Sequence, residues 1–367
     1  MCLFLFSMAL AQDVPALPSP DATIDLLSSS NATPVPVTTP NSVPGTEEYQ
    51  NGLTATTSEE KFNFFQQSSN FGNPDGEAHL GDCYRDGVGT DVDYGEALKW
   101  YQKSAIQFNG YGAFDVGLCY LKGFGTNGDY AKSLYWLKLS SDLGDAWGED
   151  WLGQSYEFGY GVKIDLKKAF ELYQKSAEQG NSQGEYNLGC LYYAATSRGT
   201  TQNYGEAVKW FQKSANQGNY NAEYFLGACS EFGFGVNQNL QEAFNWYLKS
   251  GNQGYDLAQF EVGVCLAEGK GTAQDYDSAI KWFQESANQG NPNAEYMLAV
   301  CYQNGLGIYP VGPNYSLARQ WYLSCYGKDC SEAKLVAQTL GIDFPSPTPV
   351  PKKKKKHSSN PTPTPVS

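Results

Sequence analysis

The stretch Gly76-Glu-Ala-His-Leu-Gly-Asp-Cys-Tyr84 decides the fold, because its pattern returns about every 36 residues, as far as Ala294-Glu-Tyr-Met-Leu-Ala-Val-Cys-Tyr302. A glycine that follows a large apolar residue recurs in the same register, at Gly81, Gly117, Gly153, Gly189, Gly227 and Gly263, with Ala299 in the seventh copy. A period of roughly 20 to 50 residues is typical of stacked units that bury their apolar faces against one another. The chain is therefore predicted to be a solenoid from about Glu60 to Gly341.

Each copy predicts two helices joined by a tight turn. In the first helix, the small, Leu or Val, Gly or Ala, and Tyr positions fall at i, i+4, i+5 and i+8, which places them on one face. A turn such as Gly87-Val-Gly89 follows, where glycine can adopt the left-handed conformation that ends a helix. The second helix starts at an Asp or Asn cap, as in residues 93–105, and stops at Gln-Gly-Asn. We expect an all-α, right-handed superhelical solenoid of about seven helix-turn-helix repeats with terminal capping helices.

Two further features of the repeats carry expectations. Tryptophans at one position of the second helix are predicted to be mostly buried packing residues, at Trp100, Trp136, Trp210, Trp246, Trp282 and Trp321. Two copies depart from the pattern, since residues 194–199 replace the Gly-x-Gly turn and residues 309–313 are an insertion. These departures are either functional loops or the insertions that diverging solenoids carry.

The complete pattern resembles the Sel1-like repeat, a relative of the tetratricopeptide repeat. It reads small-x-x-x-Leu-Gly-x-x-Tyr-x-x-Gly-x-Gly, followed by Ala-x-x-Trp-Tyr-x-Lys-Ser-Ala-x-Gln-Gly-Asn, and it covers most of residues 60–341. The resemblance implies an α-α superhelix that scaffolds protein complexes, for example in endoplasmic-reticulum quality control, chitin synthase activation and bacterial signalling. No catalytic residue belongs to the general family pattern, so none is assigned to this chain.

Two classes of function remain open. The first is a non-catalytic scaffold or adaptor that binds partner proteins through the solenoid groove, or a regulatory subunit of a cell-wall or quality-control enzyme complex. The second is an enzyme, because some cysteine-rich relatives are linked to β-lactam binding or hydrolysis. We expect the first class, with no catalytic residue and no cofactor. No metal site is expected, because His79 and His357 stand far from any paired ligands.

The ends of the chain differ from the repeats in composition. Residues 1–11 form a short apolar stretch that closes on Ala9-Leu-Ala11, a small-x-small pattern typical of signal-peptide cleavage. Residues 12–58 are rich in Ser, Thr and Pro, and residues 342–367 are Pro-rich around a lysine run, so both segments are expected to be disordered. The repeat solenoid is assigned to residues 59–341.

The charge of the chain favours basic partners. The chain has 39 acidic and 25 basic side chains, a net charge of -14, and five of its lysines form the run Lys352–Lys356. Without these five, the rest of the chain carries -19. Such a surface repels nucleic-acid phosphates and anionic lipid. We expect protein partners with basic or extended segments, no nucleic acid, and no transmembrane segment beyond the N-terminal stretch.

The termini leave the cellular compartment open. Lys352–Lys356 is read as a nuclear-import signal, a contact for an anionic membrane or a solubilising tail. The apolar N-terminus favours the secretory pathway or the extracellular space, with the cytoplasm or nucleus as the alternative. Asn31-Ala-Thr33 and Asn314-Tyr-Ser316 are N-glycosylation sequons that matter only in a secreted chain.

The cysteines follow the repeat. One equivalent position of the first helix carries Cys83, Cys119, Cys229, Cys265 and Cys301. Equivalent positions of packed helices lie roughly 8–10 Å apart, beyond the reach of a disulfide, so these residues are predicted to be small buried hydrophobes. Cys325 and Cys330 form a close pair, and the sequence leaves open whether a bridge between them ties the last repeat to the segment that follows.

The face of the first helix opposite its buried side is the candidate binding site. By analogy with tetratricopeptide arrays, we expect it to line a concave groove with acidic ends and an aromatic centre, suited to an extended basic segment with an apolar anchor. Trp151, Phe158 and Phe225 are alternatively packing residues between repeats. The candidate residues are Asp82, Asp86, Asp115, Lys122, Trp151, Gln154, Phe158, Asn187, Phe225, Phe232, Glu261, Glu268, Met297 and Asn304.

Overall fold

The computed structural model describes residues 43–194, 201–307, 312–325 and 328–331. Within these residues the chain forms sixteen α-helices and no strand, which confirms the all-α solenoid class. The pairs from α3 and α4 to α15 and α16 are the helices of the seven predicted repeats. The bounds are α1 (Thr46–Thr54), α2 (Ser58–Asn70), α3 (Pro74–Asp86), α4 (Tyr94–Ala105), α5 (Gly110–Lys122), α6 (Tyr130–Asp142), α7 (Ala146–Phe158), α8 (Leu166–Glu178), α9 (Ser182–Tyr193), α10 (Tyr204–Asn216), α11 (Tyr220–Phe232), α12 (Leu240–Asn252), α13 (Asp256–Glu268), α14 (Tyr276–Asn288), α15 (Pro292–Asn304) and α16 (Tyr315–Cys325).

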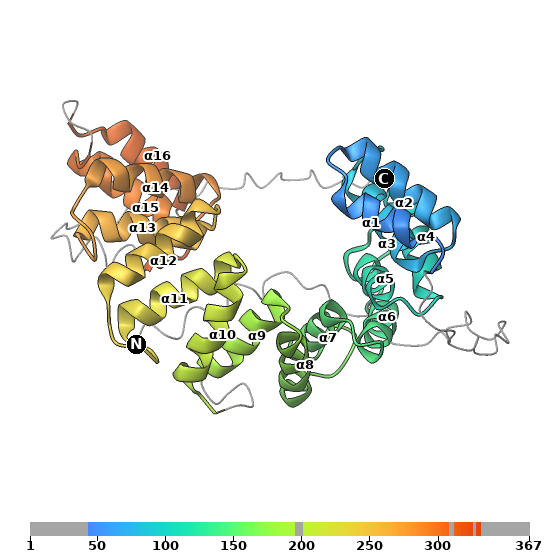
Figure 1. Cartoon of the computed structure of the whole chain (residues 1–367). Coiled ribbons are helices and arrows are strands. Elements are labelled where there is room, and N and C mark those ends of the chain that lie inside the picture. The colour runs from blue at the N-terminus through green and yellow to red at the C-terminus, as the bar shows by residue number, and fades with distance from the viewer. Residues whose placement is uncertain (1–42, 195–200, 308–311, 326–327, 332–367) are drawn as a thin grey trace, which may run out of the picture. The chain divides into compact units, whose positions relative to one another are not determined.

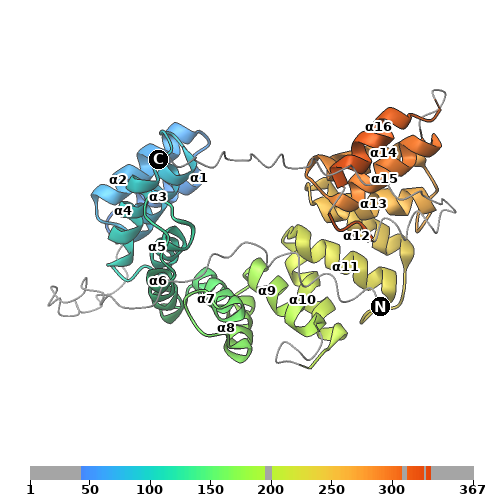
Figure 2. The same cartoon turned by 180° about the vertical axis from the view of Figure 1, so that it is seen from behind.

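The helices divide into two compact units, the first ending at Thr201 and the second beginning at Gln202. In each unit a helix packs against the helices that precede and follow it in the chain, as α4 does with α3 and α5, and α12 with α11 and α13 (Figures 1 and 2). In the first unit the first helices of neighbouring repeats also touch, α3 with α5 and α5 with α7. The fourth repeat contributes α9 to the first unit and α10 to the second.

Within a repeat, the glycine of the first helix lets a ring of the second helix lie directly on its backbone. A Cβ added to Gly153 of α7 would come within 2.8 Å of the Tyr173 ring of α8, and one added to Gly227 of α11 within 2.5 Å of the Tyr247 ring of α12. Both tyrosine side chains are fully buried. A side chain at Gly153 or Gly227 would therefore push these two helices apart.

The buried ring of the second helix is the residue after the predicted tryptophan. Tyr247 is fully buried, whereas Trp246 is half-buried and the Lys249 ammonium lies 5.3 Å from the centroid of its ring. The other five tryptophans are half-buried as well. The expectation of mostly buried tryptophans is therefore wrong in degree, because part of each side chain remains exposed, and a lysine ammonium lies over the rings of Trp100, Trp210 and Trp246.

Neighbouring repeats meet at a buried serine of the second helix. Ser104 Oγ donates a hydrogen bond to the Pro74 carbonyl at 2.7 Å, which ties α4 to the start of the first helix of its own repeat. A Cβ added to Gly112, in the next repeat, would lie 2.5 Å from the same Oγ. A small residue on both sides of this contact is what allows the next repeat to approach.

Neighbouring repeats also meet at the second glycine of the Gly-x-Gly turn. Gly161 has a φ of 69°, in the left-handed region, and a Cβ there would lie 2.7 Å from the carbonyl oxygen of Tyr130, the first residue of α6. In the second unit, Gly307 lies against the carbonyl oxygen of Tyr276 in the same way. The turn of one repeat thus rests on the start of the second helix of the repeat before it.

A buried glutamate joins the two helices of several repeats, and the sequence analysis did not identify it. Glu223 of α11 is fully buried, pairs with Lys249 Nζ at 2.8 Å and accepts a hydrogen bond from Gln253 Nε2 at 2.6 Å. Glu77 of α3 is held equivalently by Lys103 of α4 and by Gln107 in the turn after it. The ion pair and the hydrogen bond offset the desolvation of the carboxylate, so the pair acts as a clasp between the helices.

The folded region begins earlier than the sequence predicted. The composition of residues 12–58 predicts disorder, yet α1 lies within this range and packs against α2. A Cβ added to Gly52 of α1 would lie 2.5 Å from the Phe65 ring of α2, the same glycine-on-ring contact as in a complete repeat. This contact is tertiary, so composition does not report it. Residues 1–42 and 332–367, with the N-terminal apolar stretch, the lysine run and most of the predicted last capping helix, lie outside the described residues.

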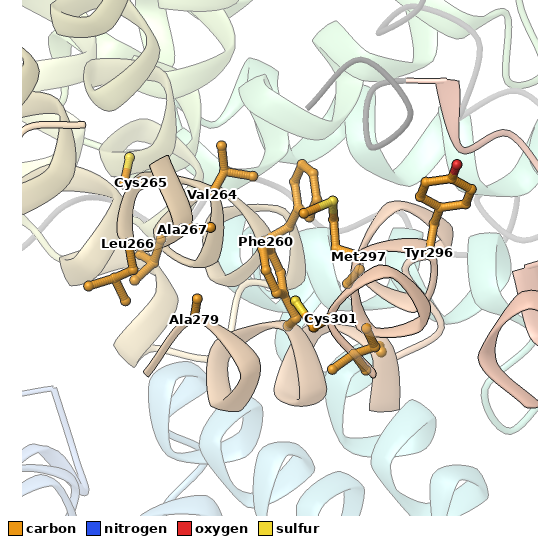
Figure 3. Close-up of a cluster of buried hydrophobic side chains, with 14 of the residues drawn as sticks. Phe260, Val264, Cys265, Leu266, Ala267, Ala279, Tyr296, Met297 and Cys301 are labelled. Atoms are coloured by element: carbon orange, nitrogen blue, oxygen red, sulfur yellow. The ribbon is translucent and has the colours of Figure 1, made fainter. Parts of the chain in front are cut away.

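The core of the second unit is formed largely by α13 and α15. Figure 3 shows Phe260 and Val264 of α13 with Met297 of α15 in one cluster of buried side chains. Cys265 and Cys301 belong to the same cluster. The interpretation of the repeat cysteines as small buried hydrophobes is confirmed, since all five are at most 4% exposed.

The substitution Gly161→Ala should destabilise the protein more than Gly180→Ala. Both glycines have positive φ, so alanine at either position adds backbone strain of about 1 kcal/mol. A Cβ at Gly161 would also collide with the Tyr130 carbonyl, whereas nothing lies within 4 Å of a Cβ at Gly180. We expect a further loss of about 2 kcal/mol for Gly161→Ala, measured by urea unfolding followed by circular dichroism. Equal losses for the two variants would contradict a contact between repeats at Gly161.

Candidate protein-binding site

The structure exposes the fourteen candidate residues unequally. The most accessible position is the last residue of the first helix, where Phe158 is 48% and Phe232 is 60% exposed. We call the exposed residues at this position the helix-end residues, which are Asp86, Lys122, Phe158, Phe232 and Asn304. Seven candidates are half-buried, namely Asp82, Trp151, Gln154, Asn187, Phe225, Glu261 and Glu268. The remaining two, Asp115 and Met297, are buried.

Placing Asp115 and Met297 on the binding face was wrong. Asp115 is 1% exposed, and its Oδ1 lies 3.3 Å from a guanidinium nitrogen of Arg85 on α3. Met297 is 0% exposed and belongs to the core cluster shown in Figure 3. Both residues lie two positions before the repeating glycine or alanine, here Gly117 and Ala299, at a position that the helical period places opposite the partner helix of the same repeat. The neighbouring repeat covers it, which a single repeat does not indicate.

Two aromatic candidates act in packing. The Trp151 ring of α7 is covered by the Lys122 ammonium of α5, 5.3 Å from the ring centroid. The Phe225 ring of α11 stacks on Phe211 of α10, with 5.1 Å between the centroids. These contacts favour the packing interpretation for both rings, which leaves Phe158 and Phe232 as the accessible aromatic candidates.

A network of carboxylates and tyrosines joins α3 to α5 in the first unit. Asp82 of α3 accepts hydrogen bonds from the hydroxyls of Tyr101 and Tyr111, each at 2.9 Å. Arg85 of α3 pairs with Asp82 at 2.9 Å and with Asp115 at 3.3 Å. Tyr111 and Asp115 both belong to α5, so the network fixes one first helix against the next.

The charges of this network are coupled. Burial raises the pKa of Asp115 well above its ordinary value, the carboxylate of Asp82 raises it further, and the Arg85 guanidinium opposes both. Arg85 also donates two hydrogen bonds to the exposed Asp86, each at 2.8 Å, which lowers the pKa of Asp86. A basic partner would therefore compete with Arg85 for Asp86.

A second network lies around Asp150 of α7. Its two oxygens accept hydrogen bonds from Asn187 Nδ2 of α9 at 2.7 Å and from Gln154 Nε2 of its own helix at 2.9 Å. Asp150 is fully buried, and burial raises its pKa to about 7 although both hydrogen bonds lower it. Two of the candidate residues, Gln154 and Asn187, therefore serve a buried carboxylate.

In the second unit the corresponding charges surround Tyr247. The Tyr247 hydroxyl donates to Glu231 Oε2 at 2.9 Å, and burial together with the carboxylates of Glu261 and Glu231 raises its pKa. Lys270 lies 2.7 Å from Glu268 and 3.7 Å from Glu231. The acidic candidates Glu261 and Glu268 are thus part of a local charge cluster that contains its own cation.

Each accessible phenylalanine lies against a pair of stacked aromatic rings. These ring pairs were not predicted from the sequence. Phe158 lies against Tyr160 at 5.8 Å between centroids, and Tyr160 stacks on Tyr130 at 5.7 Å. Phe232 lies against Phe234 at 5.6 Å, and Phe234 stacks on Tyr204 at 4.7 Å. The signal was present in the sequence as an aromatic residue between the two glycines of the turn and a tyrosine at the start of the second helix. We call these two groups the turn aromatic stacks.

Metal binding and membrane insertion find no support in the part of the chain that the structure describes. Within the described ranges there is no group of three or more His, Cys, Asp or Glu side chains placed to hold a metal ion. None of the described helices has the length and apolar character needed to span a bilayer.

Comparison with known families places the chain among Sel1 repeat proteins. The Sel1 repeat model matches seven segments that cover more than half of the chain, at residues 74–107, 110–145, 150–181, 182–219, 221–255, 256–291 and 292–324. The chain belongs to the Sel1 repeat family. Sel1 repeats generally mediate protein–protein interaction, and their solenoid fold is typically non-enzymatic.

Two solved structures resemble the chain over most of its length. One is a protective antigen present in uropathogenic Escherichia coli strains that displays an SLR fold, with 29% identity and a TM-score of 0.60 over 81% of this chain and 62% of that one. The chain thus spans less than two thirds of that antigen. The other is a Sel1 repeat protein from Oxalobacter formigenes, with 28% identity and a TM-score of 0.60 over 69% of this chain and 98% of that one. A comparison with curated proteins found no match.

The substitution Asp150→Asn should flatten the dependence of stability on pH. The pKa of Asp150 is about 7 in the folded protein and that of an unfolded aspartate about 3.9, so the folded state binds more protons between these values. Stability is therefore highest at the acidic end of this window and falls as the pH rises towards 7. Between ~pH 5 and ~pH 8 we expect wild type to lose about 2 to 3 kcal/mol through this group, measured by urea unfolding.

The matched control for this measurement is Asp142→Asn. Asp142 is an exposed carboxylate of the same unit, paired with Lys138 at 2.6 Å, and its removal should leave the slope with pH as in wild type. A slope for Asp150→Asn that equals that of wild type would show that Asp150 ionises normally in the folded protein.

Proposed function

We propose that this chain is a non-catalytic adaptor in which each unit binds an extended, basic segment of a partner protein at the ends of its own first helices. The observation that carries the proposal is the exposure of Phe158 and Phe232, two large rings at the same position of the repeat. Each is held by a turn aromatic stack, so little side-chain freedom is lost when a partner covers it. Rigid aromatic side chains of this kind are the usual anchors of protein interfaces.

A fixed carboxylate accompanies each anchor. The residue before each exposed phenylalanine is a glutamate, and Glu157 accepts a hydrogen bond from the Tyr173 hydroxyl at 2.7 Å, as Glu231 does from Tyr247 at 2.9 Å. An apolar ring next to an oriented carboxylate fits a partner segment in which an apolar side chain is followed by Lys or Arg. The net charge of -14 would attract such a segment from a distance and speed its association.

The enzymatic alternative has less support. Two types of serine spacing found in hydrolases occur. The first, Ser-x-x-Lys, begins at Ser58, Ser278 and Ser331, and the second, Gly-x-Ser-x-Gly, is Gly180-Asn-Ser-Gln-Gly184. Ser58 and Ser278 lie in the first turns of α2 and α14, Ser331 is the last described residue, and the second type spans the turn between α8 and α9. A hydrolase nucleophile of the second type follows a strand, not a helix. Asp150 has a strongly raised pKa but is buried away from solvent, so no catalytic residue is assigned.

We place the protein in the secretory pathway or outside the cell, on the basis of the apolar N-terminal stretch and the two sequons. Of the sequons, Asn314 lies in the described residues, where its Oδ1 accepts the Leu317 N–H at 3.1 Å at the start of α16. Expression in a eukaryotic host should give a secreted chain that lacks the first eleven residues and loses mass with an N-glycosidase. Retention in the cytosol with an intact N-terminus would overturn this placement.

The double substitution Phe158→Ala with Phe232→Ala should weaken partner binding without unfolding the protein. Loss of an anchor ring costs about 2 kcal/mol, or roughly 30-fold in affinity, and acts mainly on the dissociation rate. The measurement is surface plasmon resonance with a partner first captured by the full chain and then purified. Raising the ionic strength to ~0.5 M should slow association for wild type and the variant alike, because screening weakens the charge attraction.

The control for this experiment is Ile106→Ala with Phe108→Ala. Both side chains are more exposed than Phe158, at 64% and 74%, but lie in the turn after α4, away from the first-helix ends. This variant should bind as wild type does. If it lost the partner while the Phe158 and Phe232 variant kept it, the binding site would lie at the opposite turns.

A further inference from the structure

The turn from a second helix to the next first helix is closed by the same two positions in most of the described repeats. The first is the buried serine of the second helix, and the second is the residue five positions later, usually Asn or Asp, which caps the next helix. The backbone N–H of Asn291 donates to the Ser286 carbonyl at 3.3 Å. In the turn after α6 the side chains also meet, since Ser140 Oγ lies 3.3 Å from Asp145 Oδ1. The two positions are therefore neighbours in space.

In the turn after α16, cysteines occupy both positions. Counted from the repeat tryptophan, Cys325 stands at the serine position and Cys330 at the cap position. One backbone hydrogen bond is shared with the preceding repeat, since the Lys328 N–H donates to the Cys325 carbonyl at 3.0 Å, as the Gln289 N–H does to Ser286 at 3.1 Å. Both cysteines are at most 5% exposed and belong to one buried cluster. The Cys330 thiol lies near enough to raise the pKa of Cys325.

We propose that Cys325 and Cys330 form an intramolecular disulfide that closes the last described repeat. The backbone hydrogen bond between these positions in other repeats holds their Cα atoms at the short separation that a disulfide requires, roughly 4.4–6.8 Å. The other described cysteines are Cys83, Cys119, Cys190, Cys229, Cys265 and Cys301, each in a different first helix. The disulfide is independent of the proposed binding function.

In the preceding repeat, two side-chain hydrogen bonds hold the equivalent turn. Ser286 Oγ donates to the Asp256 carbonyl at 2.7 Å, and Asn291 Oδ1 accepts the Ala294 N–H at 3.3 Å. Cys325 Sγ instead contacts the carbonyl of Tyr322 in its own helix at 3.4 Å. A thiol is a weak donor and acceptor, so reduced cysteines hold the turn less firmly than serine and asparagine do.

The oxidant is a low-molecular-weight disulfide such as oxidised glutathione. The thiolate of Cys325 attacks one of its sulfurs, and one glutathione thiolate leaves. The thiolate of Cys330 then attacks the Cys325 sulfur of this mixed disulfide, and the second glutathione thiolate leaves. The two cysteines lose two hydrogens in total and the oxidant is reduced to two thiols. Burial raises the pKa of Cys325 to about 12, so the thiolate is scarce in the folded protein and the bond forms chiefly during folding.

Peptide mapping of the full chain tests the proposal. The protein is refolded with a glutathione redox buffer or with a phosphine reductant, alkylated in denaturant without further reduction, and digested with trypsin. Because Lys328 lies between the two cysteines, digestion should yield two peptides joined by the bond, and only in the oxidised sample. The other described cysteines should be alkylated in both samples. The oxidised protein should also melt several degrees higher than the reduced protein.

The double substitution Cys325→Ser with Cys330→Asn is the matched control, because it restores the pair found in the other repeats. This variant should fold, and its melting temperature should not respond to the reductant. Alkylation of both cysteines in the oxidised wild type would overturn the proposal, as would a glutathione adduct on each or a bridge to a second chain. A response of the variant to the reductant equal to that of wild type would overturn it as well.

Discussion

The whole structure depends on close approach at positions that lack a side chain. Within a repeat, the backbone at Gly153 carries the ring of Tyr173, and between repeats Gly161 lies on the carbonyl of Tyr130. These contacts set the distance within a helix pair and the distance to the next repeat. Because each repeat contacts mainly its sequence neighbours, a substitution at one glycine would disturb the packing of its own repeat and of the adjacent repeat. The recurring glycine is therefore a packing residue first, and its helix propensity is secondary.

Buried polar groups determine which helices are joined in this packing. The Glu223 clasp and the Asp82 network join specific helices through ion pairs and hydrogen bonds of defined geometry, and an unpaired charge at either place would be strongly unfavourable. The acidic side chains in these contacts contribute to the net charge of the chain, but they are paired within the protein. The charge available to a basic partner is therefore smaller than composition suggests.

The candidate site was predicted from the sequence only in part. A helical period shows which positions oppose the partner helix of the same repeat, and it correctly selected Phe158 and Phe232 as accessible residues. It placed Asp115 and Met297 on the same face although both are buried. The position they share is covered by the neighbouring repeat, and the contact between repeats is not encoded in the period of a single helix. The stacking partners of the exposed rings were missed for the same reason.

The sequence by itself determined the number of repeats, the two-helix unit, its turns and the all-α class, because each follows from spacing within about 36 residues of chain. Only the tertiary structure decided which ring of the second helix is buried, where α1 begins the folded region, and which carboxylates are paired. These outcomes depend on contacts between atoms of different helices, which spacing along the chain does not report. Tyr111 reaches Asp82 from the next repeat, and the Gly52 contact on Phe65 makes α1 part of the solenoid.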